Sequence, residues 1–556
     1  MSGYTSSIST QMTMSEALCR VAESRLEQEA LVCGKERRTY GQLLKCIDAL
    51  VRGLCELGIR KGDRVAAFLL PGSEFVDLFF AVAELGAVIV PLNPQLRRRE
   101  LTAVLQDSEP VALVTFRPIE EDIRRQFGSL RHIVSITDSG EHNLTLVGLR
   151  ATGEAAPRRQ FAVSPGDLLA LLYTSGTTGT PKGTMHSHRS LIAPVVASVK
   201  LRELWLRRPN LRAFGEMAKA LARYRGRLLR AAGRPQTFLS TVGWHTITGL
   251  EVMFQALLMG DRLVVMPHFH PRQALELVEQ EKVTVLVAVP MAFKLMLDLP
   301  GFERYDTSSL LICGSGAAPC PPHLAREIQR RFGCAVHIGF GATETAGGIA
   351  ATSLADSDER QAETVGRPMP GMEIKIVDDR RRELPPGEVG ELACRSDGLM
   401  LGYYRSPEIT AEVIDEEGWY YSGDLARIDA EGYVHIVGRK KDVIIRGGQN
   451  VYPAEIEAFL TAHPRIREAA VIGMLSALGD EDVWAFVLLE DGAEMTCQEV
   501  LDYCRAELEP YKMPSCVQFV TDFPRSGTGK PQKFKLREAA WQEMHSSHDP
   551  EGGECE

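Results

Sequence analysis

Short apolar runs alternate with longer amphipathic segments along most of this chain, and this alternation constrains the fold more than any other feature. Residues 64–70, R-V-A-A-F-L-L, predict a buried strand, which a proline and a glycine end before a helix begins at Glu74. Residues 85–94 predict another strand with a proline stop. Strand–helix alternation of this kind favours α/β layers with a largely parallel sheet.

Length and composition set the outer bounds. A chain of 556 residues is too long for one ordinary core, so the α/β class is expected as a large N-terminal domain of several subdomains and a smaller C-terminal one. A hydrophobic content of 44% and a charged content of 24% are typical of a globular protein. The net charge of −10 gives no support for nucleic-acid binding. The longest apolar runs fall short of the roughly 20 residues that a membrane span needs.

Local signals agree with this class. Thr39 and Gln42 form a capping box that predicts the start of a helix running through Leu57. Residues 261–297 predict strand, helix, strand and helix in turn. The twelve cysteines include no C-x-x-C pair, which favours isolated thiols in a reducing cytoplasm.

The stretch 173–183, Y-T-S-G-T-T-G-T-P-K-G, follows a strand predicted at 168–172. Its glycines and hydroxyl residues expose N–H and O–H donors beside one cation, Lys182, and a polyphosphate needs such donors. A solvated Ser/Thr/Gly linker is the alternative interpretation. The nucleotide loop G-x-x-x-x-G-K-[ST] does not fit, because counting from Gly176 puts Pro181, Lys182 and Gly183 where Gly, Lys and Ser/Thr should stand.

Four later stretches follow in order: 310–319, L-L-I-C-G-S-G-A-A-P; 337–344, H-I-G-F-G-A-T-E; 421–425, Y-S-G-D-L; and 524–530, P-R-S-G-T-G-K. Together with the first, they resemble the motifs of the adenylate-forming superfamily, which comprises acyl-CoA synthetases, luciferases and amino-acid adenylation domains. The resemblance runs from about residue 30 to 540. It is strongest to the acyl-CoA synthetases.

The resemblance implies roles for individual residues. ATP and AMP would be bound by Thr174, Ser175, Gly176, Thr177, Thr178, Gly179, Lys182, Gly316, Ala317, Ala318, Gly339, Phe340, Gly341, Ala342, Thr343, Asp424 and Arg439. Phe340 stands where Tyr is commoner, and its ring can stack on adenine equally well. Glu344 would hold Mg²⁺, a hard cation that prefers carboxylate and phosphate oxygens. Asp424 is expected on a turn, where its carboxylate would accept bonds from both ribose hydroxyls.

The acyl group would lie beside residues 242–249, V-G-W-H-T-I-T-G. The resemblance assigns its pocket to Trp244, His245, Gly314, Ser315, Ala346 and Gly347. Because 242–250 contains no Asp or Glu, a substrate ammonium would have no counter-ion there, which argues against an amino acid. Small walls with one large aromatic residue favour a medium-chain, cyclic or aromatic acid.

The resemblance also divides the chain. Residues 1–438 would form the adenylation domain, 439–442 a hinge with Lys441 at its pivot, and 443–545 a mobile lid, followed by a disordered acidic tail at 546–556. Arg446, Gly447 and Gly448 would face the coenzyme A arm. Lys530 would bridge the carboxylate and the α-phosphate in the transition state. The catalytic residues expected are Lys530, Thr343 and His245.

The function implied is an ATP-dependent carboxylate–CoA ligase that uses ATP, Mg²⁺ and coenzyme A and acts as a monomer or homodimer. One alternative is an acyl-AMP ligase that delivers to a carrier protein in trans. A more distant one is a non-catalytic nucleotide-binding or membrane scaffold.

One segment departs from the family pattern. Residues 200–234 form part of an unusually long stretch and contain eleven Lys/Arg against two Glu. A basic amphipathic helix can bind an anionic membrane, which would add a weak peripheral contact to a cytoplasmic enzyme. A solvated surface helix is the simpler interpretation.

Overall fold

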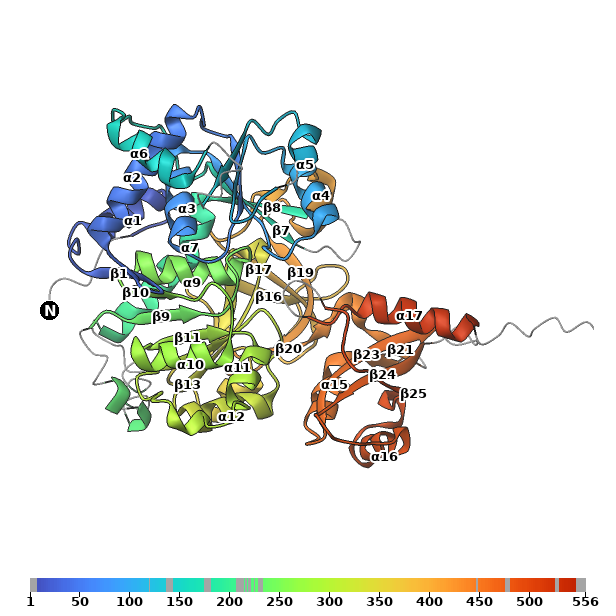
Figure 1. Cartoon of the computed structure of the whole chain (residues 1–556). Helices are drawn as coiled ribbons and strands as arrows, with labels where there is room; N and C mark the ends of the chain where they lie inside the picture. The colour runs from blue at the N-terminus through green and yellow to red at the C-terminus, as the bar shows by residue number, and fades with distance from the viewer. Residues whose placement is uncertain are drawn as a thin grey trace, which may run out of the picture. The chain divides into compact units, whose positions relative to one another are not determined.

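The computed structural model describes residues 8–119, 121–136, 144–174, 182–206, 215, 218, 222–224, 226–228, 234–446, 449–475, 481–525 and 530–546. The chain divides into two compact units of mixed helices and strands (Figure 1). Unit 1 consists of Met1–Cys320, Leu324–Ile374 and Cys394–Tyr421, and unit 2 of Pro321–His323, Lys375–Ala393 and Ser422–Glu556. The predicted α/β class is confirmed. The expected hinge at 439–442 stays a prediction.

The first sheet of unit 1 has the strand order β18-β8-β7-β4-β3-β5-β6. Its strands are β3 (Arg64–Phe68), β4 (Val88–Pro91), β5 (Ala112–Thr115), β6 (His132–Ser135), β7 (Leu168–Thr174), β8 (Lys182–Ser187) and β18 (Gly402–Tyr403). The strands β7, β4, β3, β5 and β6 are parallel, whereas β8 is antiparallel to both β7 and β18. The connecting helices are α2 (Tyr40–Glu56), α3 (Ser73–Leu85), α4 (Arg98–Ser108), α5 (Glu121–Gln126) and α6 (Leu146–Ala155).

The second sheet of unit 1 has the order β15-β14-β13-β12-β11-β9-β10-β1-β2. Its strands are β1 (Glu29–Cys33), β2 (Glu36–Thr39), β9 (Thr237–Ser240), β10 (Arg262–Val265), β11 (Val285–Ala288), β12 (Ile312–Ser315), β13 (Ala335–Ala342), β14 (Gly347–Ala351) and β15 (Arg367–Pro368). From β1 to β13 the pairing is parallel, and β2, β14 and β15 pair antiparallel. Other elements of this part are α1 (Met14–Ala22), α7 (His188–Leu206), α9 (Ile247–Leu258), α10 (Pro271–Gln280), α11 (Pro290–Leu297), η1 (Phe302–Arg304), α12 (Pro322–Phe332), η2 (Thr343–Thr345), α13 (Asp358–Glu363) and α14 (Pro407–Val413).

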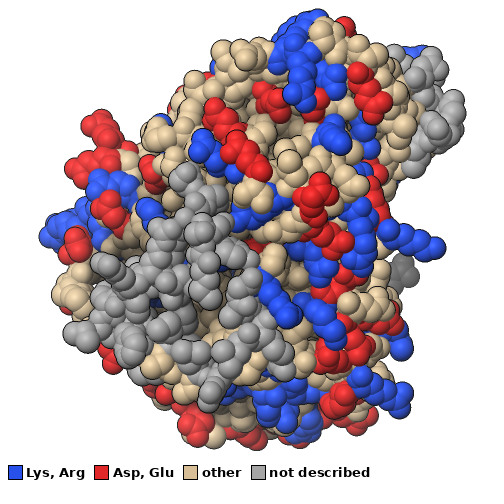
Figure 2. All heavy atoms as spheres, turned by 90° about the vertical axis from the view of Figure 1, so that its left-hand side faces the viewer, with Lys and Arg blue, Asp and Glu red and all other residues tan. Residues whose placement is uncertain are grey.

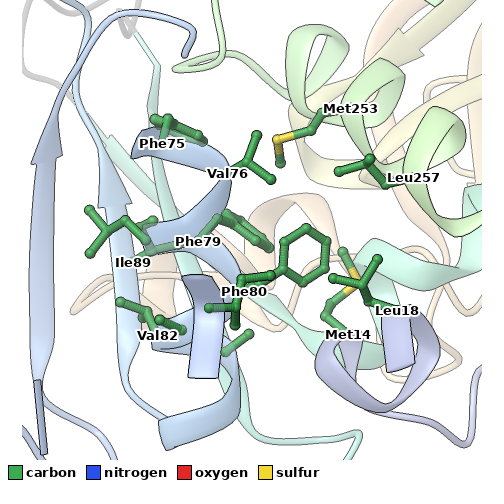
Figure 3. Packing of buried hydrophobic residues seen from close by; sticks show 14 of the residues in the cluster. Met14, Leu18, Phe75, Val76, Phe79, Phe80, Val82, Ile89, Met253 and Leu257 are labelled. Atoms are coloured by element: carbon green, nitrogen blue, oxygen red, sulfur yellow. The ribbon is translucent and has the colours of Figure 1, made fainter. Parts of the chain in front are cut away.

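Helix α3 joins these sheets because it is apolar on nearly every face. Figure 3 shows its side chains between Ile89 of β4 and the side chains of α1 and α9. The rings of Phe79 and Phe254 lie 4.9 Å apart, and those of Phe75 and Trp244 lie 5.4 Å apart. Close aromatic packing of this kind adds to the free energy gained from burying the apolar surface. The core therefore runs from β4 through α3 to the start of α9.

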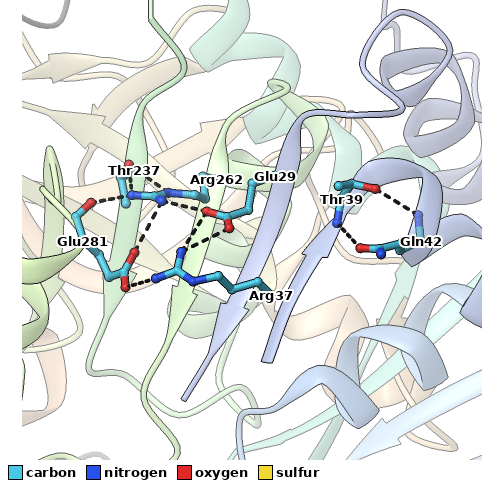
Figure 4. Close-up of polar contacts among 7 residues, drawn as sticks. All are labelled: Glu29, Arg37, Thr39, Gln42, Thr237, Arg262 and Glu281. Carbon is cyan, nitrogen blue, oxygen red and sulfur yellow. Dashed lines mark hydrogen bonds and ion pairs between the residues drawn. The ribbon is translucent and has the colours of Figure 1, made fainter. Parts of the chain in front are cut away.

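Polar contacts fix the edge of the second sheet (Figure 4). Arg262 donates from Nη1 to Glu29 Oε2 at 2.7 Å and also bonds the Thr237 hydroxyl, which ties β10 to β1 and β9. The predicted capping box is confirmed: Gln42 Oε1 accepts from the Thr39 backbone N–H at 2.9 Å, and Thr39 Oγ1 accepts from Gln42 at 3.3 Å.

Unit 2 contains smaller sheets. One has the order β16-β17-β19-β20, a second is β21-β22, and a third is β23-β24-β25. The strands are β16 (Glu373–Val377), β17 (Gly390–Arg395), β19 (Tyr420–Ile428), β20 (Val434–Arg439), β21 (Ile444–Arg446), β22 (Gln449–Val451), β23 (Ile466–Leu475), β24 (Glu481–Leu489) and β25 (Cys516–Phe519). The helical elements are η3 (Lys440–Asp442), α15 (Pro453–Thr461), α16 (Cys497–Glu507), η4 (Pro510–Lys512) and α17 (Lys533–Ser546).

The turn predicted at Asp424 is wrong. Asp424 lies within β19, where its Cα pairs with that of Arg439 in the antiparallel ladder with β20. The S-G-D sequence looked like a turn, but Gly423 reaches a φ of +69° inside the strand and the ladder is irregular just after Asp424. Glycine takes this conformation without steric cost, so the strand continues through it.

The basic segment 200–234 lies largely outside the described residues. Where it is described, its arginines contact other parts of unit 1: Arg202 bonds Asp261 at 2.8 Å, and Arg227 donates to the carbonyls of Thr307, Leu310 and Phe332. Within the described ranges, the helices are too short or too polar to span a bilayer.

Candidate active site

The strands β7 and β8 form a hairpin that carries the glycine-rich stretch between its ends. Thr174 lies opposite Lys182 at the last pair of the ladder, and Tyr173 lies opposite Gly183. The Tyr173 hydroxyl donates to Asp107 Oδ2 at 2.5 Å, which fixes the hairpin to α4. The predicted phosphate-binding residues between the strands lie outside the described residues: Ser175, Gly176, Thr177, Thr178 and Gly179.

Tyr403 contacts both Lys182 and Glu344, and it was not among the site residues predicted from the sequence. The Lys182 ammonium lies 5.6 Å from the centre of the Tyr403 ring, and the Tyr403 hydroxyl donates to Glu344 Oε1 at 2.7 Å. Tyr403 reaches this place because β18 pairs with β8, with Tyr403 opposite Thr184. The G-Y-Y sequence gave no signal of this contact.

Thr343 and Glu344 stand on the short helix η2, which a left-handed Ala346 ends at φ +55°. Beneath it, burial lowers the pKa of His186 to about 4, so this imidazole is neutral near pH 7. Within the described part of the chain, the second Glu344 oxygen, Oε2, has no hydrogen-bond or ion-pair partner. One carboxylate with a free oxygen fits Mg²⁺ that arrives on a triphosphate, since this cation is commonly held by one or two carboxylates and phosphate oxygens.

The small residues of the predicted adenine and acyl walls come together at the ends of neighbouring strands. Strands β12 and β13 are parallel, with Gly314 opposite His337. Beyond them, a Cβ on Gly316 would lie 3.5 Å from the Gly339 carbonyl, and one on Gly341 would collide with the Gly347 carbonyl. The strand β13 runs through the first part of the 337–344 motif and continues to Ala342 by pairing with β14. The other residues predicted to form these walls are Ser315, Ala317, Ala318, Phe340 and Ala346, and their role stays a prediction.

Trp244 and His245 lie just before α9, which Thr246 caps. Trp244 is buried against Phe75. Both ring nitrogens of His245 are buried and have no hydrogen-bond partner among the described residues. Burial lowers the pKa of His245 to about 4. A neutral imidazole with two unused nitrogens is suited to a polar group of a bound molecule.

Glu251 is a second residue that the sequence analysis missed. It lies on α9, where a Cβ added at Gly347 would come within 2.4 Å of its carboxylate oxygen Oε2. It accepts from Gln255 Nε2 at 3.1 Å and from the Gly348 backbone. Burial raises the pKa of Glu251 to about 7.

In unit 2, Arg439 Nε lies 3.0 Å from Asp424 Oδ1 across the β19–β20 ladder. Lys530 is half-buried, and burial together with Arg439 lowers the pKa of its ammonium, which Asp424 partly opposes. Lys441 lies in η3, and burial lowers its pKa as well. The unit therefore brings Lys530 into the electrostatic range of the two predicted ribose-binding side chains.

Arg446 ends β21 and donates to the Met513 carbonyl at 2.5 Å. Gly447 and Gly448, the other residues predicted to face coenzyme A, lie outside the described residues. Their role stays a prediction.

Two family models match this chain. The model of the AMP-binding enzyme family matches residues 18–404, more than half of the chain, and that of the AMP-binding enzyme C-terminal domain matches residues 455–530. The chain belongs to the AMP-binding enzyme family. This membership agrees with the adenylate-forming motifs and with the α/β architecture.

Relatives of this AMP-binding enzyme carry the names of acyl-CoA ligases. The medium-chain acyl-CoA ligase ACSF2, mitochondrial, of Homo sapiens is 31% identical over 95% of this chain and 87% of that protein. The medium-chain fatty-acid–CoA ligase of Escherichia coli K12 is 34% identical over 90% of this chain and 85% of that protein. The protein is thus an AMP-binding enzyme of the ligase class.

Solved structures agree. The anthranilate CoA ligase AuaEII in complex with anthranoyl-AMP has a TM-score of 0.82 and 27% identity, with 97% of this chain and 99% of that chain covered. ATP-bound MatB from Rhodopseudomonas palustris has a TM-score of 0.80 and 29% identity, with 95% and 99% covered. This AMP-binding enzyme therefore shares its fold with ATP-using, adenylate-forming enzymes.

Proposed function

We propose that the enzyme joins a non-amino-acid carboxylic acid to coenzyme A through an acyl-AMP intermediate, releasing AMP and pyrophosphate. The observation that carries this proposal is that Tyr403 contacts both Lys182 and Glu344 in unit 1. It provides one cation for phosphate and one carboxylate for the Mg²⁺ of Mg·ATP, at the base of the glycine-rich hairpin.

In the first half-reaction, a carboxylate oxygen of the acid attacks the α-phosphorus of Mg·ATP. The bond between this phosphorus and the bridging oxygen breaks, and pyrophosphate leaves with the electron pair. Lys182 holds the β- and γ-phosphates, Thr343 donates to phosphate, and Lys530 neutralises the charge that grows around the α-phosphorus. Because the carboxylate is already a competent nucleophile, positioning and preorganised charge supply most of the acceleration.

In the second half-reaction, the lid turns about Lys441, so that Lys530 withdraws and Gly447 and Gly448 face the coenzyme A arm. The coenzyme A thiol loses its proton to solvent, and the resulting thiolate sulfur attacks the acyl carbon. The bond from this carbon to the AMP oxygen then breaks, and AMP leaves with the electron pair. One site then serves both reactions.

The acid is proposed to be medium-chain, cyclic or aromatic. Small residues surround Gly314 and Gly347, and the family resemblance assigns Trp244 and His245 to the same pocket. This set of residues supports an apolar pocket. Glu251 does not provide a strong counter-ion for an amino-acid ammonium, because its raised pKa of about 7 leaves much of it protonated near neutral pH. In addition, the Glu251 carboxylate already accepts hydrogen bonds from Gln255 and from the Gly348 backbone.

Release of pyrophosphate and AMP from purified enzyme tests the proposal. The panel contains medium-chain, cyclic and aromatic acids, with amino acids as the control, each with Mg·ATP and with or without coenzyme A. Pyrophosphate release with AMP turnover only when coenzyme A is present is expected. Pyrophosphate without stimulation by coenzyme A would favour the acyl-AMP ligase that delivers to a carrier protein, and no release with any acid would contradict the proposal.

Weak membrane contact through residues 200–234 is a second proposal, and the observations favour it less. Arg202 and Arg227 are bonded inside unit 1. On the face in Figure 2, acidic and basic side chains are interspersed over the described surface. Co-sedimentation with vesicles that contain anionic lipid, compared with neutral vesicles, tests it, and equal sedimentation with both would contradict it.

A further inference from the structure

Tyr403 lies between two groups that have roles in the proposed reaction. Its hydroxyl donates to Glu344 Oε1 at 2.7 Å, and its ring lies 5.6 Å from the Lys182 ammonium. A carboxylate and an ammonium that paired directly would each be partly neutralised. Among the described residues, Lys182 and Glu344 nevertheless form no direct ion pair.

The backbone around Tyr403 is fixed on both sides. The Tyr403 N–H donates to Thr410 Oγ1 at 2.9 Å, and the next residue, Tyr404, donates its N–H to the Gly183 carbonyl at 2.7 Å. Gly402 has a φ of +131°, a conformation suited to glycine, with Thr410 directly beside it. The ring is therefore held in register with β8, the strand that begins at Lys182.

We propose that Tyr403 is a positioning residue that holds the Glu344 carboxylate apart from the Lys182 ammonium, so that the carboxylate receives Mg²⁺ and the ammonium receives phosphate. The inference rests on the proposed function and adds a residue to it. The hydroxyl orients one carboxylate oxygen and leaves Oε2 for the cation. The ring face attracts the ammonium without neutralising it.

The direction of this contact suits the task. The Tyr403 hydroxyl is the donor, and the Glu344 carboxylate oxygen Oε1 accepts. A tyrosine that merely filled the core would need no carboxylate partner. Phenylalanine would then replace it at little cost.

A double-mutant cycle with Tyr403→Phe and Glu344→Gln tests the inference. Binding of a non-hydrolysable ATP analogue is measured by calorimetry over a series of Mg²⁺ concentrations, without any acid present. Tyr403→Phe is expected to raise the Mg²⁺ concentration for half-maximal binding about tenfold, because a hydrogen bond to a charged group is lost. In the Glu344→Gln background the same change is expected to have little further effect.

Tyr404→Phe is the matched control, since it removes a hydroxyl from the neighbouring residue of the same segment. Its Mg²⁺ dependence is expected to equal that of the wild type. Tyr403→Leu removes the ring as well and is expected to weaken binding of the analogue even at saturating Mg²⁺, through Lys182.

Two results would overturn the inference: equal Mg²⁺ dependence of Tyr403→Phe and Tyr404→Phe, or additive effects of the Tyr403 and Glu344 changes. In either case wild-type pyrophosphate release would leave the proposed function standing. If the wild type neither bound the analogue nor released pyrophosphate, the proposed function itself would fall, and this inference with it.

Discussion

The two units surround their buried charges differently. In unit 1, Asp77 is fully buried, but Arg38 bonds it at 2.8 Å and Arg150 contacts it as well. In unit 2, the half-buried Lys530 has another cation, Arg439, among its charged neighbours, and its pKa is lowered. These opposite charges belong to the architecture of α3, although burial still raises the pKa of Asp77 and its Oδ1 has no hydrogen-bond partner among the described residues. An ammonium whose charged form is disfavoured gains most when an anion arrives, which is typical of a functional group.

Removing Lys530 should have the largest effect and should leave the fold intact. Lys530→Ala is expected to slow acyl-AMP formation by about 10³-fold or more, roughly 4 kcal/mol, because the charge at the α-phosphorus is no longer neutralised. Single-turnover pyrophosphate release measures this step. Thioester formation from supplied acyl-AMP should remain within about twofold of the wild type, and equal losses in both steps would refute the two-conformation mechanism.

Removing Asp77 should do the opposite, with a loss of stability and no specific loss of chemistry. Asp77→Ala removes the anion that the largely buried Arg38 and Arg150 share, and only Arg38 keeps a second carboxylate, Glu36, among the described residues, so the change is expected to cost about 3 kcal/mol in the free energy of unfolding. Urea unfolding measures it. The control is Asp491→Ala in unit 2, an exposed partner of Arg467, with an expected change within about 0.5 kcal/mol. A similar midpoint for both variants would remove the contrast between the units.

Glu251 in unit 1 differs from Asp77, since no cation of the described residues contacts it and burial raises its pKa to about 7. A carboxyl with a folded pKa above its unfolded pKa favours the folded state at low pH, and this contribution is lost as pH rises through 7. Glu251→Gln should therefore equal the wild type near pH 4.5 and exceed it by about 2 kcal/mol at pH 8, with partial exposure taken into account. Urea unfolding across this range checks it, and a difference that did not change with pH would contradict the assignment.

Local rules predicted the elements of this enzyme well, because the signals lie within a few residues. The capping box at Thr39 and Gln42 is an example. The turn prediction at Asp424 was wrong because S-G-D alone is typical of a turn. The strand there depends on pairing with Arg439, which lies beyond the end of β19 in the sequence. The strand order within each sheet was also not readable, since β1 pairs with β10, more than 200 residues later.

The site was predictable only as a set of motifs. Lys182, Thr343 and Glu344 followed from the family pattern, whereas Tyr403 did not, because its contact with Glu344 joins positions 59 residues apart. Glu251 was missed for a similar reason. It lies on α9, a helix that was not predicted from the sequence, and its neighbour Gly347 belongs to β14.

The smallest expected effect is a change in the pH dependence of the rate. It distinguishes an ammonium whose pKa is lowered from one with an ordinary pKa. Acyl-AMP formation needs the charged form of Lys530, so its rate should fall as pH rises through the lowered pKa of this side chain. Lys530→Arg keeps a charge at every accessible pH, although its planar group fits the site less well and should lower the rate. The alkaline fall should therefore move to higher pH in Lys530→Arg, measured as single-turnover pyrophosphate release from pH 7 upward. If both proteins lost activity over the same alkaline range, another group would set this limit, and the charge balance around Lys530 would not be the feature that separates unit 2 from unit 1.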